Sequence, residues 1–204
     1  MGRTMFESLR ALKGGFWRGV FPHQFAFVLD LPGRGWLLSP TTLANRLPLH
    51  HGCRALEIGA GSGYYSGSVA AQCRRLVLLD LQPEMLRKAR ARGTTSQIDG
   101  VSANASMLPF RTGSFDVVYM ITVFGEVSRQ DDMLTDIRRV LVPGGVLSIS
   151  EHLPDFDFAV FSRVRRVVER HGFALQRREG PPWSYTANFR KTLSDSQVLS
   201  EAAR

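Results

Sequence analysis

Several features are scarce or missing in this 204-residue sequence, and each absence excludes a class of protein. Only two cysteines occur, Cys53 and Cys73, and their spacing matches no metal site or disulfide framework. No apolar run reaches the roughly 18 residues of a membrane-spanning helix, and residues 1–20 lack the apolar centre of a signal peptide. Internal repeats and low-complexity blocks are also absent. We therefore expect a soluble, cytoplasmic, single-domain protein that binds no metal.

The formal net charge of +8 raises the question of an anionic partner, because 26 Lys and Arg face only 18 Asp and Glu. Basic chains can bind nucleic acid or an anionic membrane surface. The arginines are spread along the chain, however, apart from a cluster on a predicted amphipathic helix at 162–171. A solvated helix face is the simpler explanation of that cluster. Charge therefore predicts no specific nucleic-acid partner.

One stretch organises the rest of the chain. The apolar run Arg54–Ile58 suits a buried strand, and glycines follow it at alternate positions, Gly59, Gly61 and Gly63. From Tyr64 onward a helix can begin. Glycines in such a turn let a ligand approach the backbone, and a helix N-terminus points free N–H groups at that ligand. The stretch therefore predicts a ligand site, with a tight glycine turn that binds nothing as the alternative.

Two acids and one tyrosine indicate which ligand this is. A dinucleotide-binding turn, Gly-x-Gly-x-x-Gly, would need glycine where this chain has Tyr64. Glu57 ends the predicted strand and faces the crevice where open α/β sheets bind ligands, so its carboxylate would repel a pyrophosphate. A ligand with an ammonium and a sulfonium group fits better. Asp80 ends the next strand, where an acid can accept hydrogen bonds from ribose hydroxyls.

Strand and helix patterns alternate from residue 51 onward, which is typical of a parallel sheet with helices on both faces. A Ser128-x-x-Asp131 capping box is expected to open a helix that runs to about residue 142, and Pro143-Gly144-Gly145 to turn the chain into the fifth strand. Two further helices are predicted at 83–92 and 162–171. Strands are predicted at 53–58, 75–80, 97–103, 115–121, 146–150, 173–179 and 184–191.

Residues 1–46 precede the first strand and carry aromatic side chains at nearly helical spacing. Short helices are predicted there, the last with Ser39 as its N-cap and Pro40 at its first position. We interpret this segment as a lid that closes over the ligand and makes the pocket apolar; ordinary core packing and a membrane-binding segment are the alternatives. The expected division is an extension at 1–46, the main domain at 47–191 and a polar tail at 192–204.

The glycine stretch resembles motif I of the class I S-adenosylmethionine (SAM)-dependent methyltransferases, Glu/Asp-x-Gly-x-Gly-x-Gly. Residues 104–110 are similar to the family's Asp-Ala-x-x-Leu-Pro-Phe element, whose acid accepts a hydrogen bond from the adenine amino group; this chain has Asn104 there. The resemblance covers about residues 50–191 and is nearest the ubiquinone/menaquinone-biosynthesis-like (methyltransferase type 11) group. It implies an α/β fold, a Rossmann-like seven-stranded, mostly parallel sheet of order 3-2-1-4-5-7-6. Strand seven is antiparallel, helices cover both faces, and the N-terminal helices form a cap.

The same resemblance implies SAM as cofactor, S-adenosylhomocysteine as product, and no metal. Methyl transfer is an in-line displacement, so the protein mainly positions two reactants and excludes water. The residues expected to bind the cofactor are Glu57, Gly59, Ala60, Gly61, Gly63, Tyr64, Asp80, Leu81, Asn104, Ala105, Ser106 and Ile121.

Only the absence of certain motifs limits which acceptor molecules are possible. Amino-methylating nucleic-acid enzymes of this class carry Asn/Asp-Pro-Pro-Tyr/Phe after strand four, where this chain has Thr122-Val123-Phe124-Gly125-Glu126. The cysteines required for methylating pyrimidine carbon 5 or arsenite are absent as well. We therefore expect a small, apolar or aromatic acceptor. Three alternatives stay open: a lipid or quinone acceptor with weak contact to a membrane surface, a SAM-binding protein without catalysis, and a nicotinamide oxidoreductase, which Tyr64 disfavours.

An acceptor hydroxyl or acidic carbon would need a base. Acids and histidines beyond the strand ends supply candidates: His152 and Glu126 are the leading ones, and Glu151 and His23 are further candidates. His152 follows the fifth strand and faces the crevice in the predicted topology. The residues expected to form the acceptor pocket are Phe21, His23, Phe124, Trp183 and Tyr185.

Overall fold

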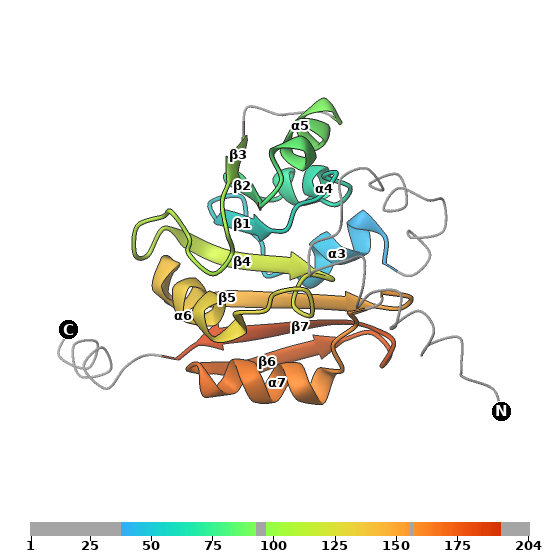
Figure 1. The fold of residues 1–204 in the computed structure, drawn as a ribbon, viewed down its shortest axis with the longest axis vertical. Helices are drawn as coiled ribbons and strands as arrows, with labels where there is room; N and C mark the ends of the chain where they lie inside the picture. Colours follow the sequence, from blue (N-terminus) through green and yellow to red (C-terminus); the bar gives the residue numbers. More distant parts are fainter. Residues whose placement is uncertain (1–37, 93–96, 156, 193–204) are drawn as a thin grey trace.

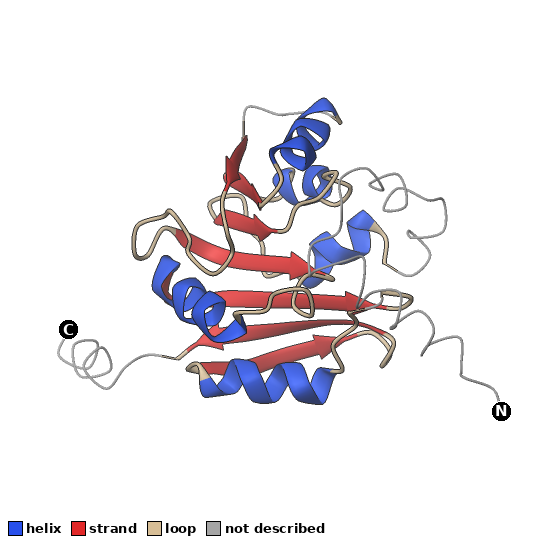
Figure 2. Cartoon of the chain, viewed as in Figure 1, coloured by secondary structure: helices blue, strands red, loops and turns tan. Residues whose placement is uncertain are grey.

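Runs of apolar residues at 54–58, 75–80 and 115–121 form the centre of one twisted sheet. A computed structural model describes residues 38–92, 97–155 and 157–192, drawn in Figures 1 and 2. Seven strands pair in the order β3-β2-β1-β4-β5-β7-β6, and only β7 runs antiparallel to the others, so the predicted fold is confirmed. The strands are β1 (Arg54–Ile58), β2 (Arg75–Asp80), β3 (Ile98–Ser102), β4 (Phe115–Ile121), β5 (Leu141–His152), β6 (Phe173–Glu179) and β7 (Ser184–Lys191).

Helices cover both faces of the sheet because each presents an apolar stripe to it. Residues of α6 and α7 pack on one face with the inward side chains of β4, β5 and β7. Residues of α3, α4 and α5 pack on the other face, over β1 and β2. The helices are α3 (Pro40–Arg46), α4 (Ser66–Ala70), α5 (Pro83–Ala91), α6 (Gln130–Val140) and α7 (Phe161–Arg170).

The start of α6 differs from the prediction. Arg129 is its N-cap, and no side chain caps the helix, so the expected capping box at Ser128 is wrong. Ser128 instead belongs to the loop before the helix. Asp131 still lies in the first turn, where a carboxylate interacts favourably with the helix dipole. Its Oδ1 lies 3.3 Å from Nε2 of His171.

The start of β5 also differs. The strand begins at Leu141, directly after α6, rather than at Val146. Its pairing with β4 jumps from Phe115 opposite Leu141 to Val117 opposite Val146, so the residues between form a bulge. Gly144 takes a φ of 69° inside this bulge. A Pro-Gly-Gly sequence that reads as a turn is therefore accommodated within the strand.

At the N-terminal side, α3 confirms the last helix predicted there. The Ser39 hydroxyl accepts a hydrogen bond from the Thr42 N–H at 3.0 Å, and Pro40 occupies the first turn. The earlier predicted helices, residues 1–37, and the tail from residue 193 lie outside the described residues. In the part of the chain that the structure describes, no helix has both the length and the apolar character to cross a membrane.

Candidate active site

The glycine turn after β1 is the first part of the site. Gly59, Gly61 and Gly63 have φ angles of 68°, 53° and 76°, which L side chains rarely adopt. A Cβ at Gly59 would lie 2.5 Å from Cγ2 of Val123, and one at Gly63 would lie 2.8 Å from Cβ of Ala89. Backbone conformation and close packing therefore both require glycine at the first and third of these positions.

The helix after this turn is shorter than expected. It begins at Ser66 rather than near Tyr64, and the Gly63 N–H bonds back to the carbonyl of Ala60 at 3.0 Å. The N–H groups of Gly59 and Ala60 donate to the Leu79 carbonyl, at 2.8 and 3.2 Å, which ties the turn to the end of β2. The turn is thus held by its neighbouring strand rather than by a long helix.

Glu57 is held as a buried carboxylate at the end of β1. Its side chain is 2 % exposed, and Oε2 accepts hydrogen bonds from the Ser66 hydroxyl at 2.6 Å and the Tyr119 hydroxyl at 2.8 Å. Burial and the adjacent Glu57 charge hold the pKa of Tyr119 well above its usual range. Two hydroxyl donors on one oxygen hold this acidic side chain in place at the end of β1.

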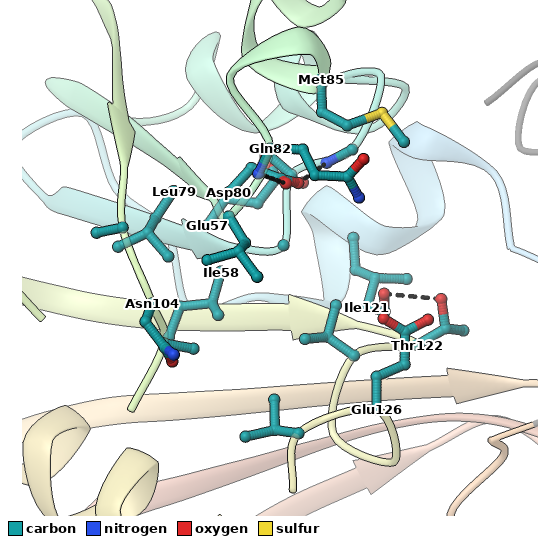
Figure 3. A pocket seen from close by; sticks show the side chains of 18 of the residues that line it. Glu57, Ile58, Leu79, Asp80, Gln82, Met85, Asn104, Ile121, Thr122 and Glu126 are labelled. Carbon is teal, nitrogen blue, oxygen red and sulfur yellow. Dashed lines mark hydrogen bonds between the residues drawn. The ribbon is translucent and has the colours of Figure 1, made fainter. Parts of the chain in front are cut away.

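Asp80 joins the turn to the start of α5. Its Oδ2 accepts a hydrogen bond from the Gly61 N–H and its Oδ1 from the Gln82 N–H, both at 2.9 Å (Figure 3). Burial raises the pKa of Asp80, while these backbone N–H groups act in the opposite direction. The two acids therefore end neighbouring strands on either side of the glycine turn.

Asn104 lies in the loop after β3, and its side chain folds back on the loop. Oδ1 accepts a hydrogen bond from the Ser106 N–H at 2.8 Å, the geometry of an Asx turn. Aspartate could form the same bond, because either side chain offers an acceptor oxygen at this place. The amide carbonyl is thus committed to the loop through one of its lone pairs.

These elements enclose a cavity of about 230 Å³ over the carboxyl ends of β1, β2 and β4 (Figure 3). All the residues predicted to bind the cofactor line it except Gly63, which contacts α5 instead. Glu126, one of the two leading base candidates, lines it as well. The lining residues that the sequence did not identify are Ile58, Ser62, Tyr65, Leu79, Gln82, Met85, Ala103, Thr122, Val123, Val127, Ser128 and Arg129.

Comparisons with known proteins agree with this geometry. Residues 56–149 match the family model described as Methyltransferase domain (Methyltransf_11). The chain is 26% identical over 164 residues to the ubiquinone/menaquinone biosynthesis C-methyltransferase UbiE of Shewanella frigidimarina, covering 74% of this chain and 64% of that protein. With UbiE of Vibrio vulnificus the identity is 28% over 152 residues, 71% of this chain and 57% of the relative. Over residues 56–149 the chain is thus similar to the SAM-dependent methyltransferases.

The fold comparison points the same way. A SAM-dependent methyltransferase from Aquifex aeolicus superposes with a TM-score of 0.77 at 19% identity, over 85% of this chain and 100% of that one. The predicted resemblance is thus confirmed, and the family implies SAM as methyl donor. The chain spans less than two thirds of the length of the curated relatives named above.

The residues predicted to form the acceptor pocket lie elsewhere in the structure than the residues predicted to bind the cofactor. Phe124 and Tyr185 are fully buried in the core shared with α6 and α7, where they pack against apolar neighbours. The Tyr185 hydroxyl donates to the Ala159 carbonyl at 2.6 Å, and its ring meets Phe161 edge-on at 5.6 Å. Trp183 is 55% exposed on the turn between β6 and β7. None of these three lines the cavity that the described residues form.

His152 is the other correction. It is the last residue of β5, 5% exposed and opposite Ser184 of β7. It does not belong to the lining of the cavity within the described part of the chain, whereas the prediction had it facing the crevice. Phe21 and His23 lie outside the described residues.

A signal for the missed lining residues was present in the sequence. Gln82 and Met85 directly follow Asp80, and residues 122–129 directly follow β4. Because carboxyl ends of parallel strands meet at one edge of a sheet, the segments after each strand belong to the same site. Loop conformation, which the sequence does not reveal, decides which of their side chains reach the cavity.

Proposed function

We propose that this protein binds SAM in the cavity over β1, β2 and β4 and transfers its methyl group to a small, apolar or aromatic acceptor. The observation that carries the proposal is the pair of buried acids, Glu57 and Asp80, on either side of the glycine turn. An electronegative cavity suits a cationic ligand, and a second acid suits its ribose hydroxyls. SAM supplies an electrophilic methyl carbon on a positively charged sulfur.

The chain's own residues would hold and orient this ligand. Asp80 would accept hydrogen bonds from the ribose, and Glu57 would attract the methionine ammonium end near Gly59. Asn104, Ala105 and Ser106 would lie beside the adenine. Apolar lining residues such as Ile58, Leu79 and Ile121 would exclude water from the reacting carbon, where the chemistry gains most from a dry and fixed arrangement.

Two observations support a lipophilic acceptor. The relatives named above are ubiquinone/menaquinone biosynthesis C-methyltransferases. Among the described residues, the exposed large apolar side chains all lie on loops or a helix start at the sheet edge where the strands' carboxyl ends meet. They are Leu81, Met107, Leu153, Val160 and Trp183. An aromatic or quinone-like ring, free or at a membrane surface, would suit such an edge.

The Asp80→Ala variant tests the cofactor site. It should weaken binding of both SAM and S-adenosylhomocysteine at least tenfold, about 1.4 kcal/mol, because buried ribose hydroxyls lose a charged acceptor. Isothermal titration calorimetry measures this directly, with NAD as the ligand expected not to bind. Asp99→Ala is the matched control, because Asp99 lies on β3 and forms an exposed ion pair with Arg75. Equal affinities in all three proteins would remove Asp80 from the site.

Asn104→Asp separates two orientations of the amide. If the Asn104 carbonyl serves both Ser106 and the adenine amino group, aspartate should keep or improve SAM affinity, since it offers acceptors only. If the amide N–H₂ donates to the ligand instead, affinity should fall more than tenfold. Calorimetry with SAM distinguishes the two results. Ser102→Ala, at the end of the same β3 strand, is the control for a nonspecific change of the β3 edge.

We also propose that residues 1–46 act as a lid over the cofactor, with core packing and membrane binding as the competing roles. Deleting residues 1–21 should leave a folded protein that binds S-adenosylhomocysteine more weakly and releases it faster. Stopped-flow release and sedimentation with vesicles of anionic phospholipid separate the outcomes. Intact cofactor affinity with lost sedimentation would identify a membrane segment. A truncated chain that does not fold would identify core packing.

A further inference from the structure

Glu151 is a buried acid that the cofactor cavity does not use. It is the penultimate residue of β5, 1% exposed, and lies opposite Tyr185 of β7. Its Oε2 accepts a hydrogen bond from the Ala159 N–H at 3.1 Å. Its Oε1 is buried and accepts no hydrogen bond of good geometry among the described residues, although the Phe124 N–H lies near enough to the carboxyl to lower its pKa. Buried carboxyl oxygens are normally satisfied, so an unsatisfied one beside a ligand cavity suggests a functional reason.

The position of Glu151 is just behind the cavity wall. The carbonyl of the preceding residue, Ser150, accepts a hydrogen bond from the Thr122 N–H at 2.8 Å. Thr122 begins the β4–α6 loop, residues 122–129, most of which line the cavity. This loop packs directly on the segment after β5, because a Cβ at Gly125 would meet the Asp157 carbonyl oxygen at 1.9 Å. The Glu151 carboxyl is bonded to that same segment.

Within the described part of the chain, no cation is among the groups that shift the pKa of Glu151. Burial raises the pKa of Glu151 to about 8, and the charges of Asp155 and Glu126 add to the shift, against the N–H groups of Ala159 and Phe124. At neutral pH the group is therefore protonated. The charged and titratable groups on the elements around it are Glu126 of the β4–α6 loop, Asp155 after β5, His152 of β5, Tyr185 of β7 and Arg178 of β6, whose guanidinium lies over the Tyr185 ring.

Glu126, unlike Glu151, lies on the cavity side of this wall. It lines the cavity from the β4–α6 loop, is half-buried, and Figure 3 shows its carboxyl extended toward Ile121 and Thr122. Two carboxyl groups that influence each other in a low dielectric do not both ionise readily, and the more buried one retains the proton. Glu151 is the more buried of the two.

We propose, resting on the methyl transfer proposed above, that Glu126 and Glu151 form one proton-holding pair. Glu151 keeps its proton inside the protein, and Glu126 stays ionised at the cavity to act as the base. The acceptor's O–H or acidic C–H gives its proton to the Glu126 carboxylate. The electron pair of that bond forms the new bond to the methyl carbon, and the pair of the broken carbon–sulfur bond stays on sulfur. Glu151 touches no reactant and is a positioning residue.

The test is a carboxyl titration of the full chain by NMR with ¹³C-labelled glutamate, and it requires no acceptor. In the wild type, Glu151 should titrate near pH 8, and the Glu126 resonance should show a main step at lower pH and a second inflection where Glu151 ionises. Glu126→Gln removes one negative charge and should lower the pKa of Glu151 by about half a unit to one unit. Glu151→Gln should remove the second inflection and leave the main step of Glu126 in place.

Glu169→Gln is the control, because Glu169 pairs with Arg165 on the outer side of α7 and should leave both titrations unchanged. A Glu151 that titrates below pH 6, or a pKa that is the same in Glu126→Gln and wild type, would overturn the proposal. If Glu126→Gln does not fold, the wild-type titration alone tests the proposal: the Glu126 resonance must show the second inflection where Glu151 ionises. Calorimetry with SAM on the same sample tests the proposed function separately, so failure of cofactor binding and failure of the carboxyl pair are distinct results.

Discussion

Replacing Glu151 with glutamine should stabilise the protein at pH 8 by up to about 5 kcal/mol, and should remove much of the pH dependence of unfolding between pH 5 and 8. The folded pKa of about 8 lies above the unfolded value near 4.3. The native state therefore holds a proton that the unfolded state has already lost, and wild-type stability falls as pH rises through this window. Glutamine resembles the protonated acid at every pH.

Urea unfolding of wild type and Glu151→Gln at pH 5, 6, 7 and 8 measures the effect. The difference in free energy of unfolding should be small at pH 5 and grow by about 1.4 kcal/mol per pH unit until it levels off near pH 8. Comparing the two proteins cancels the contributions of other titrating groups. Glu169→Gln, whose partner Arg165 is exposed, should track the wild type. Parallel curves for all three would mean that Glu151 is ionised in the folded protein.

The sheet topology and the cofactor side were predictable because short-range chemistry determines them. Strand β1 is short and mostly buried, and the glycines that follow it have positive φ angles. Asp80 comes at the end of the adjacent parallel strand, so its carboxyl necessarily meets the glycine turn. The conformation of the surrounding loops did not have to be known to predict that these residues lie together.

The acceptor side was not predictable, because side-chain direction there depends on loops and bulges. Phe124 follows Val123 in a tight turn, and the turn sends Val123 to the cavity and Phe124 to the core. Tyr185 faces the helix α7 because of its parity on β7, which is set by pairing with β5. The bulge at 142–145 shifts the β5 register, and sequence alone reads it as a turn. Aromatic composition therefore pointed to three residues, Phe124, Trp183 and Tyr185, that do not line the cavity formed by the described residues.

The position of Glu151 could be predicted from the sequence, but its environment could not. Leu147, Ile149 and Glu151 alternate along β5, so an acid on the apolar face of a central strand could be read from the period-two pattern. The contacts around its carboxyl, however, come from elsewhere in the chain: the Ala159 N–H donates to Oε2, and Gly125 packs closely on Asp157. Those contacts link residues far apart in the chain.

The second large effect is expected at Gly63. Gly63→Ala should destabilise the protein by about 2–4 kcal/mol, because it combines an unfavourable φ with a close contact. Gly63 has a φ of 76°, and its new Cβ would lie 2.8 Å from Cβ and 2.9 Å from Cα of Ala89. Ala89 belongs to α5 and is itself buried, so its backbone does not yield easily. Overpacking of this kind displaces α5 from the sheet.

Two further glycines separate these causes by thermal and urea unfolding. Gly113 has a φ of 67° but nothing within 4 Å of its Cβ position, so Gly113→Ala measures the backbone term alone, about 1 kcal/mol. Gly67 lies in α4 with open space around it, so Gly67→Ala should be neutral or stabilise by up to about 1 kcal/mol. The excess of Gly63→Ala over Gly113→Ala is then the contact with Ala89. If the two variants lose the same stability, helix α5 moves aside freely, and the third glycine of the motif is required only for its backbone conformation.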